Sequence, residues 1–346
     1  MNSRVTNKRI LELDALRGLA AILVVFFHVT INNDQYSFFK FGTTGVDLFF
    51  LISGFVIFMS IQNITKGIDF IINRISRLYP TYWTAVTITF LLILLKSSYD
   101  GVSFNVNLVY NFIVNLSMFQ FYFRVQDLDG PYWTLVIEML FYIFILIVFK
   151  LKLLNHLNVI GITICLIVVL SINYDPDSKL IKGIIWWIPL LQFMPLFLAG
   201  TVFYKLYQSK ENQLQNYLII VSCLLCQVAL FPFVGRSFHF INQFEYFVLL
   251  CSYNLLFVLF VNKKLVFIIN KFSIFLGTIS YSLYLIHQYL STKILIPYFC
   301  DQLGINFWIV VIFINLPIII GLSALITYKV EIPYSKLMKE KLRTLF

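Results

Sequence analysis

The chain of 346 residues repeats uninterrupted apolar stretches of about 20 residues, which are separated by short charged segments. A helix of that length crosses the apolar core of a bilayer, because each residue adds about 1.5 Å along the helix axis. Hydrophobic residues make up 60% of the chain and charged residues 12%, which excludes an ordinary soluble domain. Strands of a membrane β-barrel would instead show short alternating segments. The sequence therefore predicts an all-α membrane protein.

The charged segments divide the chain into about ten predicted transmembrane helices, which we expect to form one bundle in a single domain, residues 1–346. These spans lie near 15–32, 43–62, 80–96, 132–149, 157–173, 184–204, 215–233, 241–261, 274–296 and 306–328. The run 104–123 is also apolar. Its residues Asn107, Asn111 and Asn115 form a polar stripe, so it is either an eleventh span or an amphipathic surface helix.

The distribution of Lys and Arg decides between these two topologies, because cytoplasmic loops carry an excess of both residues. With ten spans most loop Lys and Arg fall on the side of the two termini, whereas an eleventh span would distribute them almost evenly. We therefore predict ten spans with both termini in the cytoplasm. The net charge of +10 then follows from topology, so we expect a lipid bilayer and no nucleic acid as a partner.

The first span carries ionisable residues on one face. Ten residues separate Arg17 from His28, which places both on the same side of a helix, about 16 Å apart along its axis. Asp14 precedes Arg17 by three residues on that face. Ionisable groups at such depth are costly unless they face a partner or a wet cavity. This face is therefore a candidate polar track through the bilayer.

His28 is the strongest candidate for chemistry. A neutral imidazole accepts the proton of an attacking hydroxyl, or it carries an acyl group itself. The alternative is a packing histidine that hydrogen-bonds across helices. The guanidinium of Arg17 suits a phosphate or a polarised acyl oxygen, with a structural pair to Asp14 as its alternative.

Glu138 enters the fourth span about two turns after Pro131, which suits the first position of a helix. We expect its depth from the outer face to resemble that of His28. A carboxylate against the second ring nitrogen of His28 would fix the tautomer of the imidazole and stabilise the imidazolium. The alternative is a solvated carboxylate that lines a vestibule.

Seven short motifs follow one another along the chain. They are Leu13-Asp14-Ala15-Leu16-Arg17-Gly18, Arg17 with His28 eleven positions later, Gly45-Val46-Asp47-Leu48-Phe49-Phe50, Ser53-Gly54-Phe55, Trp133-Thr134-Leu135-Val136-Ile137-Glu138, Ser280-Tyr281-Ser282-Leu283-Tyr284-Leu285-Ile286-His287 and Glu331-Ile332-Pro333. In this order they resemble the acyltransferase-3 family of integral membrane acyltransferases. The resemblance implies a cytoplasmic acyl-CoA donor and an extracytoplasmic sugar acceptor. Thr134 stands where serine is usual, and Ile332 where a basic residue is common, which weakens any role for the last motif.

Several further residues are candidates for substrate binding. Arg74 and Arg77 precede Pro80 one turn apart, so they either contact CoA phosphates or only contribute to topology. His287, with Tyr284 at nearly the same angular position, either binds the acceptor or packs between helices. Asp47 and Trp133 are weaker candidates. Trp133 either stacks on a sugar ring or belongs to the aromatic belt of the membrane.

We therefore predict transfer of an acyl group, most simply acetyl, from cytoplasmic acetyl-CoA to a hydroxyl of a cell-surface polysaccharide or its lipid-linked precursor. In this hypothesis Glu138 orients His28, and both direct transfer and an acetyl-histidine intermediate fit. We expect no metal, no permanently bound cofactor, and a location in the bacterial inner (plasma) membrane. Two other classes stay open. One is a transporter or flippase with an Arg, His and Glu relay, and the other is a scaffold derived from an enzyme.

Overall fold

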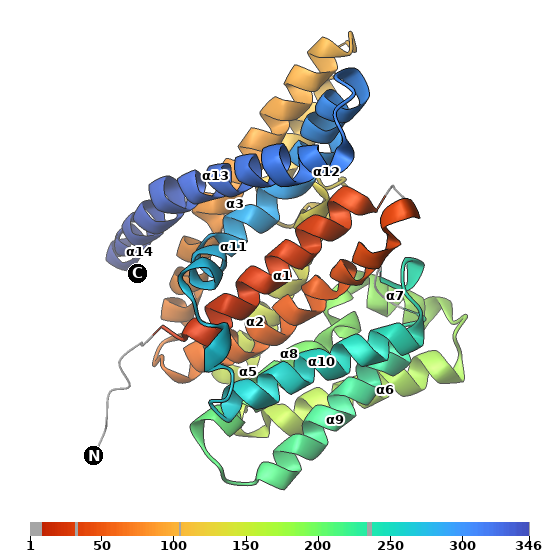
Figure 1. Cartoon of the computed structure of the whole chain (residues 1–346). Helices are drawn as coiled ribbons and strands as arrows, with labels where there is room; N and C mark the ends of the chain where they lie inside the picture. Colours follow the sequence, from red (N-terminus) through yellow and green to blue (C-terminus); the bar gives the residue numbers. More distant parts are fainter. Residues whose placement is uncertain (1–8, 32–33, 104, 234–236, 346) are drawn as a thin grey trace.

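The computed structural model describes residues 9–31, 34–103, 105–233 and 237–345, and these ranges form helices and turns without any strand. Within them, eight helical segments are long and apolar enough to cross a membrane, which confirms an all-α membrane protein. These segments are Leu11–Thr30, Phe38–Gln62, Gly67–Tyr99, Gly130–Lys150, Leu154–Tyr174, Gln213–Leu230, Gln243–Val261 and Phe307–Leu345. Most of them run side by side in one bundle (Figure 1).

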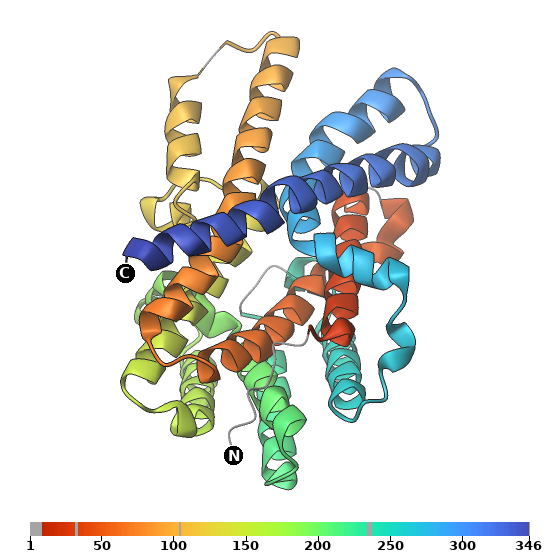
Figure 2. The ribbon, with the colours of Figure 1, turned by 90° about the vertical axis from the view of Figure 1, so that its left-hand side faces the viewer.

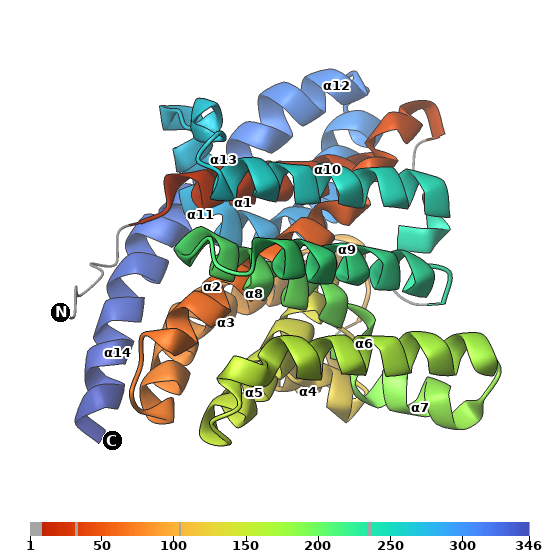
Figure 3. The same cartoon turned by 90° about the horizontal axis from the view of Figure 1, so that it is seen from below.

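The helices carry the labels of Figures 1 and 3. They are α1 (Leu11–Thr30), α2 (Gly45–Gln62), α3 (Gly67–Tyr99), α4 (Val106–Asn115), α5 (Trp133–Lys150), α6 (Leu157–Tyr174), α7 (Lys179–Trp187), α8 (Met194–Gln208), α9 (Gln213–Leu230), α10 (Gln243–Val261), α11 (Lys271–Tyr289), α12 (Phe307–Ile309), α13 (Leu316–Ile326) and α14 (Ile332–Leu345). Wider π-helical turns extend α11 and join α12 to α13 and α14.

The predicted continuous span 184–204 is wrong. The chain breaks there, because α7 ends at Trp187 and α8 begins at Met194. Pro189 restricts the backbone of the residue before it, and Pro195 suits the first turn of the new helix. The 15 residues of α8 rise only about 22 Å, yet α8 is buried along most of its length between α2, α6, α9 and α10.

The predicted span 274–296 corresponds to α11, which is not among the eight apolar segments. Its 19 residues include serines, tyrosines and a histidine, which lower its mean hydropathy. The third span also differs from its prediction, because α3 begins at Gly67 rather than near residue 80 and continues through Pro80. Arg74 and Arg77 therefore lie within a helix, whose first turns pack against α14 and α5.

The run 104–123 does not form a span, as predicted. Its helix α4 has ten residues and rises about 15 Å, half the thickness of the apolar core of a bilayer. Asn115, at the buried end of the polar stripe, donates from its side chain to the Gln126 carbonyl oxygen at 3.0 Å and accepts the Leu128 backbone N–H at 3.1 Å. The stripe therefore fixes the loop that leads into α5.

Two helix pairs approach each other closely at glycines. A Cβ on Gly277 of α11 would lie 2.0 Å from the Asp14 carbonyl oxygen of α1, and one on Gly54 of α2 would lie 2.1 Å from the Phe197 carbonyl oxygen of α8. Small residues allow such close backbone contact between membrane helices. These contacts fix α1 and α2 in the middle of the bundle.

The start of α1 and the end of α14 lie on the same side of the molecule, on the left in Figures 1 and 3. Figure 2 views the molecule from this side and shows α14 crossing α3. The opposite side contains the end of α1 and the α7 region. That the first side faces the cytoplasm stays a prediction from the distribution of Lys and Arg.

Candidate active site

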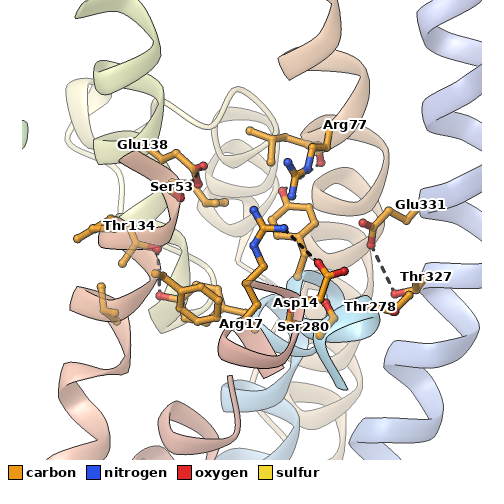
Figure 4. Close-up of a pocket in the computed structure, with 18 of the residues that line it drawn as sticks. Asp14, Arg17, Ser53, Arg77, Thr134, Glu138, Thr278, Ser280, Thr327 and Glu331 are labelled. Atoms are coloured by element: carbon orange, nitrogen blue, oxygen red, sulfur yellow. Dashed lines mark hydrogen bonds and ion pairs between the residues drawn. The ribbon is translucent and has the colours of Figure 1, made fainter. Parts of the chain in front are cut away.

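A cavity of about 300 Å³ lies between α1, α2, α3, α5, α11 and the helical segment that ends in α14. We call it the arginine cavity. Its charged lining residues are Arg9, Asp14, Arg17, Arg77, Glu138 and Glu331 (Figure 4). Ser53, Thr134, Thr278, Ser280 and Thr327 add hydroxyl groups. Arginines and carboxylates thus meet inside the bundle, where their charges need partners or water.

Asp14 organises one side of the arginine cavity. Its carboxylate pairs with Arg9, and a second oxygen lies 3.7 Å from the Arg17 guanidinium. Arg9 also donates to the Thr278 hydroxyl of α11 at 2.6 Å. The predicted pair of Arg17 and Asp14 is therefore present. Arg17 extends from α1 toward the middle of the cavity in Figure 4, so the pair orients it without removing it from the cavity.

The structure separates the two arginines that precede Pro80. Arg77 lines the arginine cavity and has no hydrogen-bond or ion-pair partner within the described part of the chain. Arg74 is buried outside the cavity, with its guanidinium 5.4 Å from the Phe70 ring centre and 5.5 Å from that of Tyr142. Of these two arginines, Arg77 is therefore the one that is placed to meet an anion in this cavity.

Glu138 lies in the arginine cavity and not beside His28. Its carboxylate accepts a hydrogen bond from the Tyr142 hydroxyl at 2.6 Å. It also accepts one from the Ser53 hydroxyl at 3.2 Å (Figure 4). His28 lies level with Pro131, where the two residues line a second cavity. Glu138 is seven residues further along the chain, or about 10 Å further into the bundle. The prediction that Glu138 holds the His28 ring is therefore wrong.

The partner of His28 is His287. The second cavity, of about 180 Å³, lies between the ends of α1 and α11 and the start of α5, and we call it the histidine cavity. His28 lines this cavity, and its Nδ1 lies 3.0 Å from Nε2 of His287, which is fully buried and does not itself line the cavity. Asp47, Trp133, Tyr284 and Gln288 also line this cavity.

The carbonyl groups around the two imidazoles determine their tautomers. His287 Nδ1 lies 2.9 Å from the Tyr284 carbonyl oxygen and 3.1 Å from that of Leu283. A carbonyl oxygen only accepts, so Nδ1 of His287 carries the proton and its Nε2 is an acceptor in the neutral ring. His28 Nδ1 must then donate to it, and the Val24 carbonyl oxygen at 3.1 Å favours the same tautomer. The lone pair of neutral His28 is consequently on Nε2.

The remaining predicted residues lie around the histidine cavity. Asp47 is buried and accepts a hydrogen bond from the Tyr246 hydroxyl at 3.0 Å. The Tyr284 hydroxyl lies 3.0 Å from that of Thr134. Tyr284 and Val46 line both the histidine cavity and the arginine cavity, so these two side chains mark the place where the cavities meet.

Sequence reasoning missed Gln288 and underestimated Ser53. The Gln288 Oε1 atom is buried at the histidine cavity and has no hydrogen-bond partner within the described ranges. Its signal was an amide directly after the histidine of the ninth predicted span. Ser53, which the sequence shows only as part of a short motif, donates to Glu138 inside the arginine cavity. Glu331 also lines that cavity and accepts from the Ser282 hydroxyl at 3.1 Å.

Comparison with known proteins assigns the chain to a family. A family model described as an acyltransferase domain matches residues 10–327. The protein named "Putative acetyltransferase ORF330" of Acidianus two-tailed virus is 27% identical over 79% of this chain and 80% of its own length. The protein named "Putative membrane-bound transacylase BcsY" of Komagataeibacter xylinus is 33% identical over 39% of this chain and 36% of its own length. No solved structure matches. The chain belongs to the acyltransferase-3 family of membrane acyltransferases.

Proposed function

We propose that this protein transfers an acetyl group from cytoplasmic acetyl-CoA to a hydroxyl of a cell-surface polysaccharide or its lipid-linked precursor, in the bacterial plasma membrane. One observation carries the proposal: the arginine cavity and the histidine cavity meet at Val46 and Tyr284. A donor held by arginines in the first cavity would thereby lie next to the second cavity, which His28 lines. The acetyltransferase name of the viral relative supports acetyl as the acyl group.

The arginine cavity suits the donor because acyl-CoA carries phosphates at one end and a thioester at the other. Arg77 offers a guanidinium that makes no hydrogen bond within the described ranges and shares the cavity with the Glu331 carboxylate, and Arg9 is half-exposed at the same cavity. Guanidinium groups bind phosphate through two parallel hydrogen bonds. The acyl arm then extends past Arg17 toward Tyr284. Glu138 and Asp14 balance the charge of Arg17 when no donor is bound.

The histidine cavity suits the transfer step. Nε2 of His28 accepts the proton of the acceptor hydroxyl while the hydroxyl oxygen attacks the thioester carbonyl carbon. The carbon–sulfur bond breaks, and the proton passes from the imidazolium to the thiolate, so the products are an acetyl ester and CoA. His287 accepts the Nδ1–H of His28 throughout and stabilises the positive ring.

A two-step route uses the same atoms. Nε2 of His28 attacks the thioester carbonyl carbon, the carbon–sulfur bond breaks, and CoA departs as a thiolate that takes a proton from water. The acceptor hydroxyl then displaces the acetyl group from Nε2 and releases its proton to water, so the products are again an acetyl ester and CoA. Rapid acid quenching separates the two routes. With labelled acetyl-CoA and no acceptor, the two-step route leaves label on the wild-type chain and none on a His28→Ala variant, whereas direct transfer leaves both unlabelled.

The experiment that tests the proposed function uses purified protein in sealed liposomes, with radiolabelled acetyl-CoA outside and an unacetylated surface glycan inside. We expect label on the enclosed glycan and equal release of CoA outside. His28→Ala should abolish both, while His156→Ala, at an exposed histidine in the short 3₁₀ helix before α6, should retain them. A transporter or a scaffold would release no CoA with any variant, and that result would refute the proposal.

A further inference from the structure

A third cavity opens beside the histidine cavity. It measures about 480 Å³ and lies between the loop after α4, the start of α5 and the turn that joins α7 to α8. We call it the aromatic groove. Its aromatic lining residues are Phe121, Trp133 and Trp186, and its polar ones are Gln126, Asp127 and Gln192. The groove lies on the side of the molecule that contains α7 and the end of α1 (Figure 1). The start of α1 lies on the opposite side.

The walls of the aromatic groove are held by specific contacts. The rings of Phe121 and Trp186 lie 5.0 Å apart at 44°, and Trp186 keeps 41% of its surface exposed. The Tyr122 hydroxyl donates to the Trp187 carbonyl oxygen at 2.9 Å, which ties the loop to α7. Within the same loop, the Gln120 amide donates to Asp127 at 2.7 Å. The aromatic and polar walls are thus fixed relative to each other.

This lining matches the chemistry of a sugar. A pyranose ring has an apolar face of C–H groups, which packs on aromatic rings, and a rim of hydroxyls, which bond to amides and carboxylates. An anionic ligand fits poorly, because the lining includes Asp127 and no Lys or Arg. A lipid chain would match the aromatic rings but not the polar side chains of Gln126 and Asp127 in the same lining. The groove therefore favours an uncharged saccharide.

The aromatic groove leads to the imidazole pair. Gly130 and Trp133 line both the groove and the histidine cavity. Because Gly130 has no side chain, the Gln288 amide packs directly against its backbone between the two cavities, and a Cβ there would lie 2.1 Å from Oε1 of Gln288. That oxygen, which has no partner among the described residues, borders the histidine cavity. A sugar bound in the groove would thus have its neighbour within reach of His28.

We infer that the aromatic groove binds uncharged sugar residues of the acceptor glycan, next to the residue whose hydroxyl enters the histidine cavity. The inference rests on the proposed function and specifies its acceptor side. Trp186 and Phe121 form the stacking platform. Asp127, Gln126 and Gln192 bond to the hydroxyl rim, and Trp133 separates the bound sugar from the reacting one.

The test compares Trp186→Ala with Trp187→Ala. Trp187 is adjacent and also exposed, but it stacks on Tyr122 and does not line the groove. The probe is the unacetylated surface glycan from cells that lack this protein, with acetyl-CoA as donor and CoA release as the readout. We expect Trp186→Ala to raise the KM for glycan about tenfold and to leave the KM for acetyl-CoA near its wild-type value.

A Trp186→Tyr variant keeps an aromatic face and should recover most of the lost glycan affinity. Trp187→Ala should raise the KM for glycan far less than Trp186→Ala, because Trp187 only packs against the Trp186 ring at 5.0 Å, and it should leave the KM for acetyl-CoA unchanged. An unchanged KM for glycan in Trp186→Ala would refute the groove while leaving the proposed function intact, as would an equal rise in Trp187→Ala. Absence of CoA release in the wild-type protein would instead refute the proposed function, and this inference with it.

Discussion

Nε2 of His287 lies 3.0 Å from Nδ1 of His28, and this contact joins α11 to α1 at the far end of the closest helix pair in the bundle. Two carbonyl oxygens fix the proton of His287 on Nδ1, so His287 acts only as an acceptor toward His28. The hydrogen bond between the two rings therefore runs in one direction, from His28 to His287. His287 sets the tautomer of His28, and His28 presents Nε2 for chemistry.

The role of His287 can be tested by replacing its acceptor atom. His287→Ala should lower kcat about 100-fold, because the His28 ring loses the group that fixes its tautomer and stabilises its positive form. His287→Gln offers an amide oxygen to the same N–H and should recover part of the loss. Steady-state kinetics would show the change in kcat with little change in the KM for acetyl-CoA. Equal kcat values in wild type and His287→Ala would remove His287 from the mechanism.

The fold was predictable wherever composition alone determines a helix. The predicted spans 43–62, 157–173 and 241–261 correspond closely to α2, α6 and α10, because long apolar runs leave a membrane chain no alternative to helix. The predictions failed where polar residues or prolines interrupt that signal. The apolar run around Pro189 continues although the helix breaks there, and the charged start of α3 is helical although the apolar run begins later.

Arg74 and Arg77 should respond differently to truncation. Arg77→Ala should raise the KM for acetyl-CoA about tenfold, because the arginine cavity loses its unpaired guanidinium. Arg74→Ala should instead lower the free energy of unfolding by about 2 kcal/mol, since its side chain packs between two aromatic rings. Kinetics and thermal unfolding of both variants in detergent would check this pair of expectations. If instead Arg74→Ala raised the KM for acetyl-CoA and Arg77→Ala lowered only the free energy of unfolding, the donor phosphates would be placed at Arg74.

Arg17 tests whether fork geometry matters in the arginine cavity. Arg17→Lys keeps the charge near Asp14 but loses the planar set of donors, so we expect kcat/KM to fall about tenfold. Initial rates across a range of acetyl-CoA concentrations would measure this. Full activity would show that Arg17 acts through charge alone.

The residues of the candidate site were predictable one by one, but their contacts were not. Helical periodicity places Arg17 and His28 on one face of α1 and identifies Glu138 and His287 on other helices. Which of these meets His28 depends on how far each helix is shifted along its neighbour. That shift is set by close contacts such as the one between Gly277 and the Asp14 backbone. In the sequence, Gly277 is visible only as a small residue, without its contact. His287 therefore occupies the place beside His28 that we expect for Glu138 from the sequence.

Gly277 offers a direct test of that helix contact. Gly277→Ala places a Cβ 2.0 Å from the Asp14 carbonyl oxygen, so α1 and α11 must separate. We expect a loss of about 3 kcal/mol in the free energy of unfolding, together with reduced activity, because the same shift moves Arg17 and separates His28 from His287. Gly321→Ala in α13 is the matched control, since a Cβ there meets no atom within 4 Å. Thermal unfolding and CoA release for both variants would measure the effect. If the two glycines tolerated alanine equally well, α1 and α11 would not be held together by backbone contact at this site.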